Sequence, residues 1–274
     1  MESRLDITSI DKTLQDTWGV KKIQAMPQKG RTALIYSLAG RGKTTLINTL
    51  KGKILLINID CGEQVIDTEN PDNEIYVMNL IGDDTPTSMA VIRKFEAFTD
   101  WLLKQDTLPW DYIVLDNISL IENSMLFAIV ERRNKENAKI KSPDQGAYGE
   151  AGFALLDVLT SLRNLTFKGV HLIYIAWEKT EKITDFGGEV HSEKGPMLVG
   201  QSQLKICGLV DFVMALRVDK NGNRYLQLDA DHKYAGKCRD EKGIVFPKVL
   251  ECPKDSRDTL QTFFDLLKKN DIKD

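Results

Sequence analysis

The clearest chemistry in this sequence belongs to a short segment that ends at Thr45. An apolar run, Ala33 to Leu38, leads into Ala39-Gly40-Arg41-Gly42-Lys43-Thr44-Thr45, and apolar residues then recur at helical spacing. A glycine-containing loop between a strand and a helix points successive backbone N–H groups at one anion. The segment therefore predicts a phosphate-binding loop related to G-x-x-x-x-G-K-[ST]. Its expected nucleotide contacts are Ser37, Leu38, Ala39, Gly40, Arg41, Gly42, Lys43, Thr44 and Thr45.

Two side chains of this loop carry the expected chemistry. Lys43 is predicted to reach the β and γ phosphates, which makes it a catalytic residue, and Thr44 supplies a hydroxyl to Mg²⁺. The loop departs from the pattern at Ser37, where glycine is expected, and a residue with a Cβ restricts a positive φ. The alternative is an incidental Gly-Lys-Thr in a surface turn, which the strand before it and the helix after it disfavour.

A second part of the site is predicted at Asp116. The apolar run Tyr112 to Leu115 has the character of a buried strand, and Asp116 follows it directly. A carboxylate at the carboxyl end of such a strand faces the phosphate-binding loop and holds Mg²⁺, commonly through water. The alternative is that Asp116 caps the helix that starts near Ile118.

Hydrolysis also needs a group that orients or deprotonates the attacking water, and no glutamate follows Asp116. The apolar run Ile54 to Ile59 ends in Asp60-Cys61-Gly62-Glu63. In a doubly wound sheet this end lies at the same edge as the phosphate-binding loop. Glu63 is the predicted catalytic base and Asp60 the second choice, and an ordinary loop carboxylate remains an open alternative.

The patterns around these residues predict an α/β fold with a mostly parallel central sheet and helices on both faces. The predicted strands are Thr32 to Leu38, Ile54 to Ile59, Ile75 to Leu80, Tyr112 to Leu115 and Val170 to Ala176. The predicted helices are Lys43 to Leu50, Ser88 to Lys104, Ile118 to Lys135 and Glu150 to Leu165.

The C-terminal part changes character. Phe212 to Val218 and Arg224 to Asp229 flank Asn221-Gly222, which predicts a hairpin that extends the sheet with antiparallel strands. Asp258 to Lys269 is a predicted closing amphipathic helix. Residues 1–30 are polar and weakly patterned, so we expect an N-terminal arm followed by one core domain over residues 31–274.

Composition excludes few functions. The apolar fraction is 42%, the charged fraction 28% and the net charge -3, values that are ordinary for a globular domain and that neither support nor exclude nucleic acid as a partner. The four cysteines show no spacing typical of a metal site or a disulfide framework. With no apolar stretch long enough to span a bilayer and no signal-peptide pattern, we expect no membrane partner and a cytoplasmic location.

The motifs resemble the RecA-like ATPase core, and most closely the phage-encoded RecA-like AAA-type ATP-binding proteins associated with recombination and single-strand annealing. The resemblance runs from Arg31 to Arg239 and rests on the loop at Ser37 to Thr44, the strand ends at Asp60 and Asp116, and the later Gly195-Pro196 and Ala235 to Arg239 segments. It implies ATP and Mg²⁺ as cofactors and a water-activating glutamate at Glu63.

The resemblance also implies partners. Such proteins form rings or filaments in which basic residues of a neighbouring subunit complete the ATP site, and Lys237 and Arg239 match those positions. Ordinary solvated charges are the equally weighted alternative. Single-stranded DNA is implied at Lys179 to Met197, through Lys179, Lys182 and Lys194, although acidic residues nearly balance this segment and a capping hairpin is the alternative.

Together these features predict a Mg²⁺-dependent ATPase that single-stranded DNA stimulates and that acts in phage-type DNA recombination or replication. Two alternatives stay open. One is a nucleotide-gated assembly module with little turnover. The other is a small-molecule phosphotransferase, which needs a lid with several arginines, whereas Arg132, Arg133 and Arg217 are isolated in the sequence.

Overall fold

The computed structural model describes residues 16–17, 30–67, 70–136, 142–184, 188, 190–231, 233–239, 246–253 and 256–268, without the side chains of Glu63, Ile183 and Lys268. The predicted N-terminal arm, residues 1–30, lies outside the described residues except for residues 16, 17 and 30. The division into an arm and one core domain therefore stays a prediction.

The centre of the molecule is one sheet whose strands run in the order β10-β8-β7-β1-β5-β4-β2-β3, with β6 paired to β5 and β9 to β7. The path from β7 to β3 is parallel, and β8, β9 and β10 add antiparallel pairs on the other side. The strand bounds are β1 Thr32–Ser37, β2 Gly52–Asn58, β3 Asn73–Asn79, β4 Tyr112–Asp116, β5 His171–Thr184, β6 Val190–Pro196, β7 Phe212–Val218, β8 Arg224–Gln227, β9 Lys237–Cys238 and β10 Val249–Glu251. The predicted fold class is confirmed.

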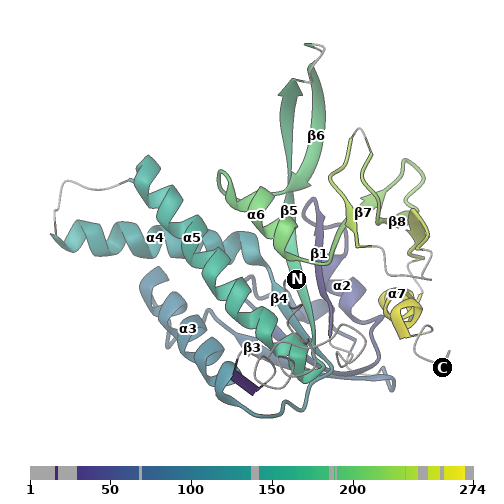
Figure 1. Cartoon of the computed structure of the whole chain (residues 1–274), viewed down its shortest axis with the longest axis horizontal. Coiled ribbons are helices and arrows are strands. Elements are labelled where there is room, and N and C mark those ends of the chain that lie inside the picture. Colours follow the sequence, from purple (N-terminus) through teal and green to yellow (C-terminus); the bar gives the residue numbers. More distant parts are fainter. Residues whose placement is uncertain are drawn as a thin grey trace, which may run out of the picture.

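Helices cover both faces of this sheet (Figure 1). The described helices are α2 Lys43–Ile47, α3 Ser88–Lys104, α4 Ile118–Glu136, α5 Gln145–Leu162, α6 Ser202–Leu209 and α7 Thr259–Lys268, with short 3-10 turns at Glu63–Val65 and Arg163–Lys168. Buried residues of α3, α4, α5 and α6 form one hydrophobic cluster with the sheet, and those of α2 and α7 form a second.

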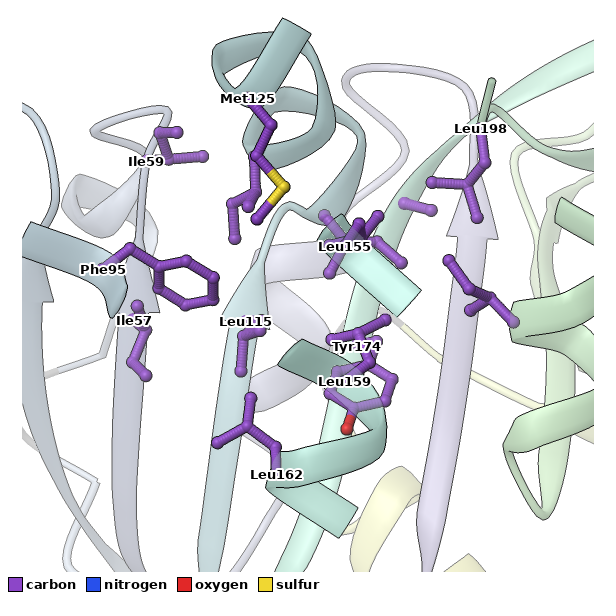
Figure 2. Close-up of a cluster of buried hydrophobic side chains, with 14 of the residues drawn as sticks. Ile57, Ile59, Phe95, Leu115, Met125, Leu155, Leu159, Leu162, Tyr174 and Leu198 are labelled. Atoms are coloured by element: carbon purple, nitrogen blue, oxygen red, sulfur yellow. The ribbon is translucent and has the colours of Figure 1, made fainter. Parts of the chain in front are cut away.

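Successive side chains of the central strands point to opposite faces of the sheet, and both faces are buried, so the strands appear in the sequence as unbroken apolar runs. Ile57, Leu115 and Tyr174 point toward α3, α4 and α5, as Figure 2 shows. Their neighbours Leu56 and Val114 belong to the opposite cluster. A strand that is buried on both faces gains from an apolar side chain at every position, at roughly 25 cal/mol per Å² of apolar surface.

Several boundaries differ from those predicted. Helix α5 begins at Gln145 rather than Glu150, because the Asp144 carboxylate accepts a 2.7 Å bond from the Ala147 N–H and caps the helix. Strand β5 continues to Thr184 and pairs with β6, so the segment Lys179 to Met197 is a hairpin that projects beyond the sheet (Figure 1). No helix in the described residues is long and apolar enough to span a membrane.

Candidate nucleotide site

The predicted site residues meet at the carboxyl edge of the parallel strands. The loop after β1 lies at this edge, as do the ends of β2 and β4, and β5 runs between β1 and β4. Asn58 at the end of β2 is in register with Asp116 at the end of β4, so the residues that follow β2 lie beside Asp116. This is the edge at which parallel α/β sheets place their ligands.

The loop between β1 and α2 has the backbone of an anion-binding bend. Gly40 and Gly42 adopt φ of 72° and 90°, a region that other L-residues avoid. Ser37 is the last residue of β1, and its φ is not positive. Among the described residues other than glycine, Cys61 alone has a positive φ. Serine at position 37 therefore costs the loop no backbone strain.

Lys43 is buried at the head of this loop. Its ammonium donates hydrogen bonds to the backbone oxygens of Ser37 and Leu38, each at 3.0 Å, and to Ser37 Oγ at 3.2 Å. Burial lowers the pKa of Lys43, while the negative charges of Asp116 and Asp60 oppose that shift. The ammonium is thus held by loop oxygens that an incoming phosphate can replace.

Asp116 and Thr44 lie in direct contact across the site. Thr44 Oγ1 donates to Asp116 Oδ2 at 2.6 Å. Burial raises the pKa of Asp116 to about 6, and the nearby charge of Asp60 adds to that shift, while the Thr44 bond and Lys43 oppose it. A buried carboxylate that is costly to ionise gains strongly from a cation.

The Thr44–Asp116 pair fits the way in which proteins bind Mg²⁺ together with a nucleotide. Among the described residues, no group of three or more His, Cys, Asp or Glu side chains is arranged to hold a metal. Mg²⁺ in phosphate-transfer sites instead takes one or two protein ligands, with substrate phosphates and water in the other positions. A threonine hydroxyl 2.6 Å from a carboxylate supplies that donor set.

The helix-cap alternative for Asp116 is wrong. The Asn117 side chain caps α4, because its Oδ1 accepts a 2.9 Å bond from the Leu120 N–H. Asp116 ends β4 instead and is directed at Thr44.

Of the two carboxylates predicted after β2, the structure describes the side chain of Asp60 but not that of Glu63. Asp60 Oδ1 accepts a 3.0 Å bond from the Gly62 N–H, and its Oδ2 lies 3.5 Å from Asn117 Nδ2. Asp60 is also close enough to act on the pKa of Lys43 and of Asp116. Glu63 begins the 3-10 turn that follows, and its side chain lies outside the described part of the chain.

Lys237 and Arg239 both have partners within the chain. The Lys237 ammonium donates to three backbone carbonyls at the C-terminal end of α6, at 2.6 to 3.0 Å. Arg239 Nη1 lies 3.0 Å from Asp211 Oδ1. In this chain both cations hold the C-terminal strands and α6 together, and their action on a neighbouring subunit's site stays a prediction.

The hairpin β5–β6 carries the three lysines predicted to contact DNA. Lys179 pairs with Glu181 at 2.7 Å, and Lys194 pairs with Glu178 at 3.0 Å. Lys182 is exposed. Two of the three positive charges are therefore neutralised within the chain, and the DNA-binding role of all three stays a prediction.

Hydrogen bonds that the sequence did not reveal join helix α4, which follows Asp116, to the base of this hairpin. Ser119, on the first turn of the helix that follows Asp116, accepts a 3.0 Å bond from the Trp177 N–H. Glu122, one turn further along α4, is fully buried and accepts a 2.7 Å bond from the Val199 N–H. Helix α4 thus holds both ends of the hairpin.

Arg224 is a second residue that sequence reasoning missed. It begins β8, yet its guanidinium lies against the phosphate-binding loop: a Cβ added at Gly42 would lie 2.5 Å from Arg224 Nη1. The loop and Arg224 are far apart in the sequence, and no local pattern around Arg224 marks the contact.

The sheet, the loop after β1 and the Thr44–Asp116 pair together define a P-loop nucleoside triphosphatase domain. The chain belongs to the AAA domain family, whose model matches residues 29–239, most of the chain. The matched range agrees closely with the Arg31 to Arg239 segment that carries the motifs. No curated protein matches the sequence significantly. Family membership supports nucleotide binding and ATPase activity.

Proposed function

We propose that this domain binds ATP together with Mg²⁺ and hydrolyses it, and that single-stranded DNA stimulates the hydrolysis during phage-type recombination or replication. The observation that carries the nucleotide part is the Thr44–Asp116 contact beside the buried Lys43 ammonium. These groups supply one cation, one hydroxyl and one carboxylate at the edge where the sheet places ligands. The active form is proposed to be a ring or filament of identical chains.

Each residue of the site has a defined task in this proposal. The loop from Ser37 to Thr45 binds the phosphates through backbone N–H groups, and Lys43 neutralises charge on the β and γ phosphates. Thr44 and Asp116 would hold Mg²⁺, which neutralises the same phosphates when bound. Stabilising the charge of the transition state in a buried site is the largest part of such catalysis.

The attacking water needs a carboxylate that accepts its proton or orients it. Asp116 is already bonded to Thr44. Among the described side chains, Asp60 is the second carboxylate close to Asp116, and it makes no bond to Thr44. Its oxygens have a backbone N–H and the Asn117 amide as neighbours, which fix its direction. We therefore place Asp60 ahead of Glu63 for this task.

Asp60→Asn is expected to lower the maximal rate of ATP hydrolysis by about 100-fold, since general-base groups contribute about that much. ATP affinity should stay within a few-fold of the unmodified protein, because Asn keeps the shape and the bond to Gly62. The measurements are steady-state phosphate release and nucleotide binding at equilibrium. Glu63→Gln is the matched variant, and a rate loss confined to it would return the base to Glu63.

The DNA part of the proposal is supported by the hairpin and by helix α4. The hairpin projects from the same edge as the nucleotide site (Figure 1), and Ser119 and Glu122 of α4 are hydrogen-bonded to residues at its base. The helix that begins two residues after Asp116 is therefore fastened to the hairpin on which DNA is proposed to bind.

ATP hydrolysis measured with and without single-stranded DNA tests the proposal, with duplex DNA of equal length as the control. Stimulation by the single strand alone is the expected result. Turnover that single-stranded DNA leaves unchanged would contradict the DNA part, and tight binding without turnover would favour a nucleotide-gated assembly module.

A phosphotransferase is the less favoured function. Arg133 pairs with Asp144 at 2.8 Å and with Glu150 at 3.0 Å, and Arg132 also pairs with Glu150. These arginines fasten α4 to α5 and do not form a lid over the nucleotide. Transfer of the phosphoryl group to a metabolite in the same assay would reverse this preference.

A further inference from the structure

We propose that Arg224 binds a phosphate of the nucleotide from within the same chain, at the mouth of a pocket that receives the nucleoside. The inference rests on the proposed nucleotide binding and deepens it. It assigns a cation that completes the site in cis, whereas the sequence placed the additional cations, Lys237 and Arg239, on a neighbouring subunit.

The first observation is the contact between Arg224 and the loop. A Cβ at Gly42 would lie 2.5 Å from Nη1 and 3.2 Å from Cζ of Arg224. A side chain at position 42 would push the guanidinium away from this position. The group therefore lies directly on the bend whose N–H groups are proposed to bind phosphate.

The second observation is that this guanidinium is free to bind an anion. Within the part of the chain that the structure describes, Arg224 has no ion-pair partner and no hydrogen bond from its guanidinium, although the residue is only partly exposed. The other arginines of these C-terminal strands are occupied: Arg217 pairs with Asp231 at 3.8 Å, and Arg239 with Asp211 at 3.0 Å. A half-buried, unpaired cation gains most from an anion that enters beside it.

The strand order decides which phosphate lies at Arg224. Strands β4 and β8 lie on opposite sides of β1 (Figure 1). Asp116 ends β4, and Arg224 begins β8. Thr44 and Asp116 would hold the Mg²⁺ that neutralises the terminal phosphates of the nucleotide. The γ end of the nucleotide then points toward β4, and the α phosphate and nucleoside point toward β7 and β8, where Arg224 is.

A pocket of about 280 Å³ lies where the nucleoside should go. It begins at Thr45, the last residue of the loop, and Arg224 forms part of its wall. Leu46, Leu216 and Pro253 contribute apolar surface. Most of the other lining residues are polar, among them Asn48, Thr49 and Ser256. Polar groups in such a wall can bond to the hydroxyls of a ribose and the edge of a base, and the position of the pocket fits a nucleoside attached to the α phosphate.

Arg224→Gln is the variant that tests the phosphate contact. We expect the dissociation constants of ADP and ATP to rise by about tenfold or more and by similar factors, since one charge-assisted contact is lost from both. The maximal rate of hydrolysis should change much less than these constants. Arg224→Lys, which keeps the charge but not the planar group, should give an intermediate loss.

Ser256→Trp tests the pocket, because Ser256 lines it and a large ring there fills it. This variant should weaken ADP binding and leave the binding of inorganic tripolyphosphate unchanged. Arg224→Gln should weaken both ligands. Equal ADP affinity in Ser256→Trp and the unmodified protein would overturn the assignment of the pocket.

Lys220→Ala is the matched control, because it removes one exposed positive charge from the turn between β7 and β8. Its nucleotide affinity should be unchanged, and thermal unfolding should show that all variants are folded. Normal ADP affinity in Arg224→Gln combined with lost affinity in Lys43→Ala would overturn the inference and leave the proposed function standing. Normal ADP affinity in both Arg224→Gln and Lys43→Ala would overturn the inference and the proposed function together.

Mixing the variants tests whether Arg224 acts in cis. At an ATP concentration well below saturation, equimolar Lys43→Ala and Arg224→Gln chains should show no recovery of ATP hydrolysis above the sum of the two, because each chain lacks one part of its own site. Recovery on mixing would place Arg224 in the site of a neighbouring chain and overturn the proposal.

Discussion

Lys43→Ala is expected to reduce the catalytic efficiency of ATP hydrolysis by at least about 100-fold, since a positioned donor to transition-state charge is worth that much. The Lys43 ammonium is buried within 3.2 Å of three loop oxygens and lies near the charges of Asp116 and Asp60. Alanine removes the buried positive charge that the loop presents to the β and γ phosphates. Steady-state kinetics and equilibrium binding of ATP measure the effect.

The control for this variant is Lys51→Ala. Lys51 is an exposed lysine a short distance beyond α2 that pairs with Asp72 at 3.3 Å, so its loss removes an equal charge outside the loop. Its ATP turnover should be normal. Normal affinity and normal turnover in Lys43→Ala would contradict the assignment of the loop as the phosphate site.

Asp116→Asn is expected to abolish most Mg²⁺-supported hydrolysis and, at the same time, to stabilise the nucleotide-free protein. The pKa of Asp116 rises from 3.8 to about 6, chiefly because the carboxylate is buried. Since the folded state binds this proton more tightly than the unfolded state, the free energy of unfolding falls as the pH rises from about 3.8 to about 6. At neutral pH the carboxylate is ionised and the full cost of burying its charge is present. Removing that charge should raise the free energy of unfolding by about 1 to 3 kcal/mol.

Denaturant unfolding at several pH values measures this gain. It should be largest at neutral pH and should vanish as the pH falls below the range between the two pKa values. Asp111→Asn is the matched control, because Asp111 immediately precedes the same strand at its other end and accepts a 2.8 Å bond from the Lys53 N–H. Its hydrolysis should be normal. A loss of stability in Asp116→Asn at neutral pH would show that the ionised carboxylate stabilises the nucleotide-free fold.

Most of the fold could be predicted from local patterns. The strands β1, β2 and β4 are unbroken apolar runs because both of their faces are buried, and the order of strands and helices follows from that reading. The missed elements are short or polar. Helix α6 has few buried residues, and β9 and β10 depend on pairing with strands far away in the sequence, which no local pattern encodes.

For the site, the sequence by itself determined the phosphate-binding loop and the strand-end carboxylate. Ser37 to Thr45 and Asp116 follow directly on buried strands, and both depend on residues that are neighbours in the chain. Their mutual approach, with Thr44 Oγ1 at 2.6 Å from Asp116 Oδ2, was foreseeable because parallel strands end at one edge.

Only the tertiary structure decided which charges are free to act. Lys237, Arg239, Lys179 and Lys194 are all basic in the sequence, yet each is bonded within the chain. Arg224 looked like an ordinary strand residue, and folding places it on Gly42. The physical reason is that the state of a charged side chain depends on partners brought in by packing across the sheet, at separations that no spacing of residues along the chain records.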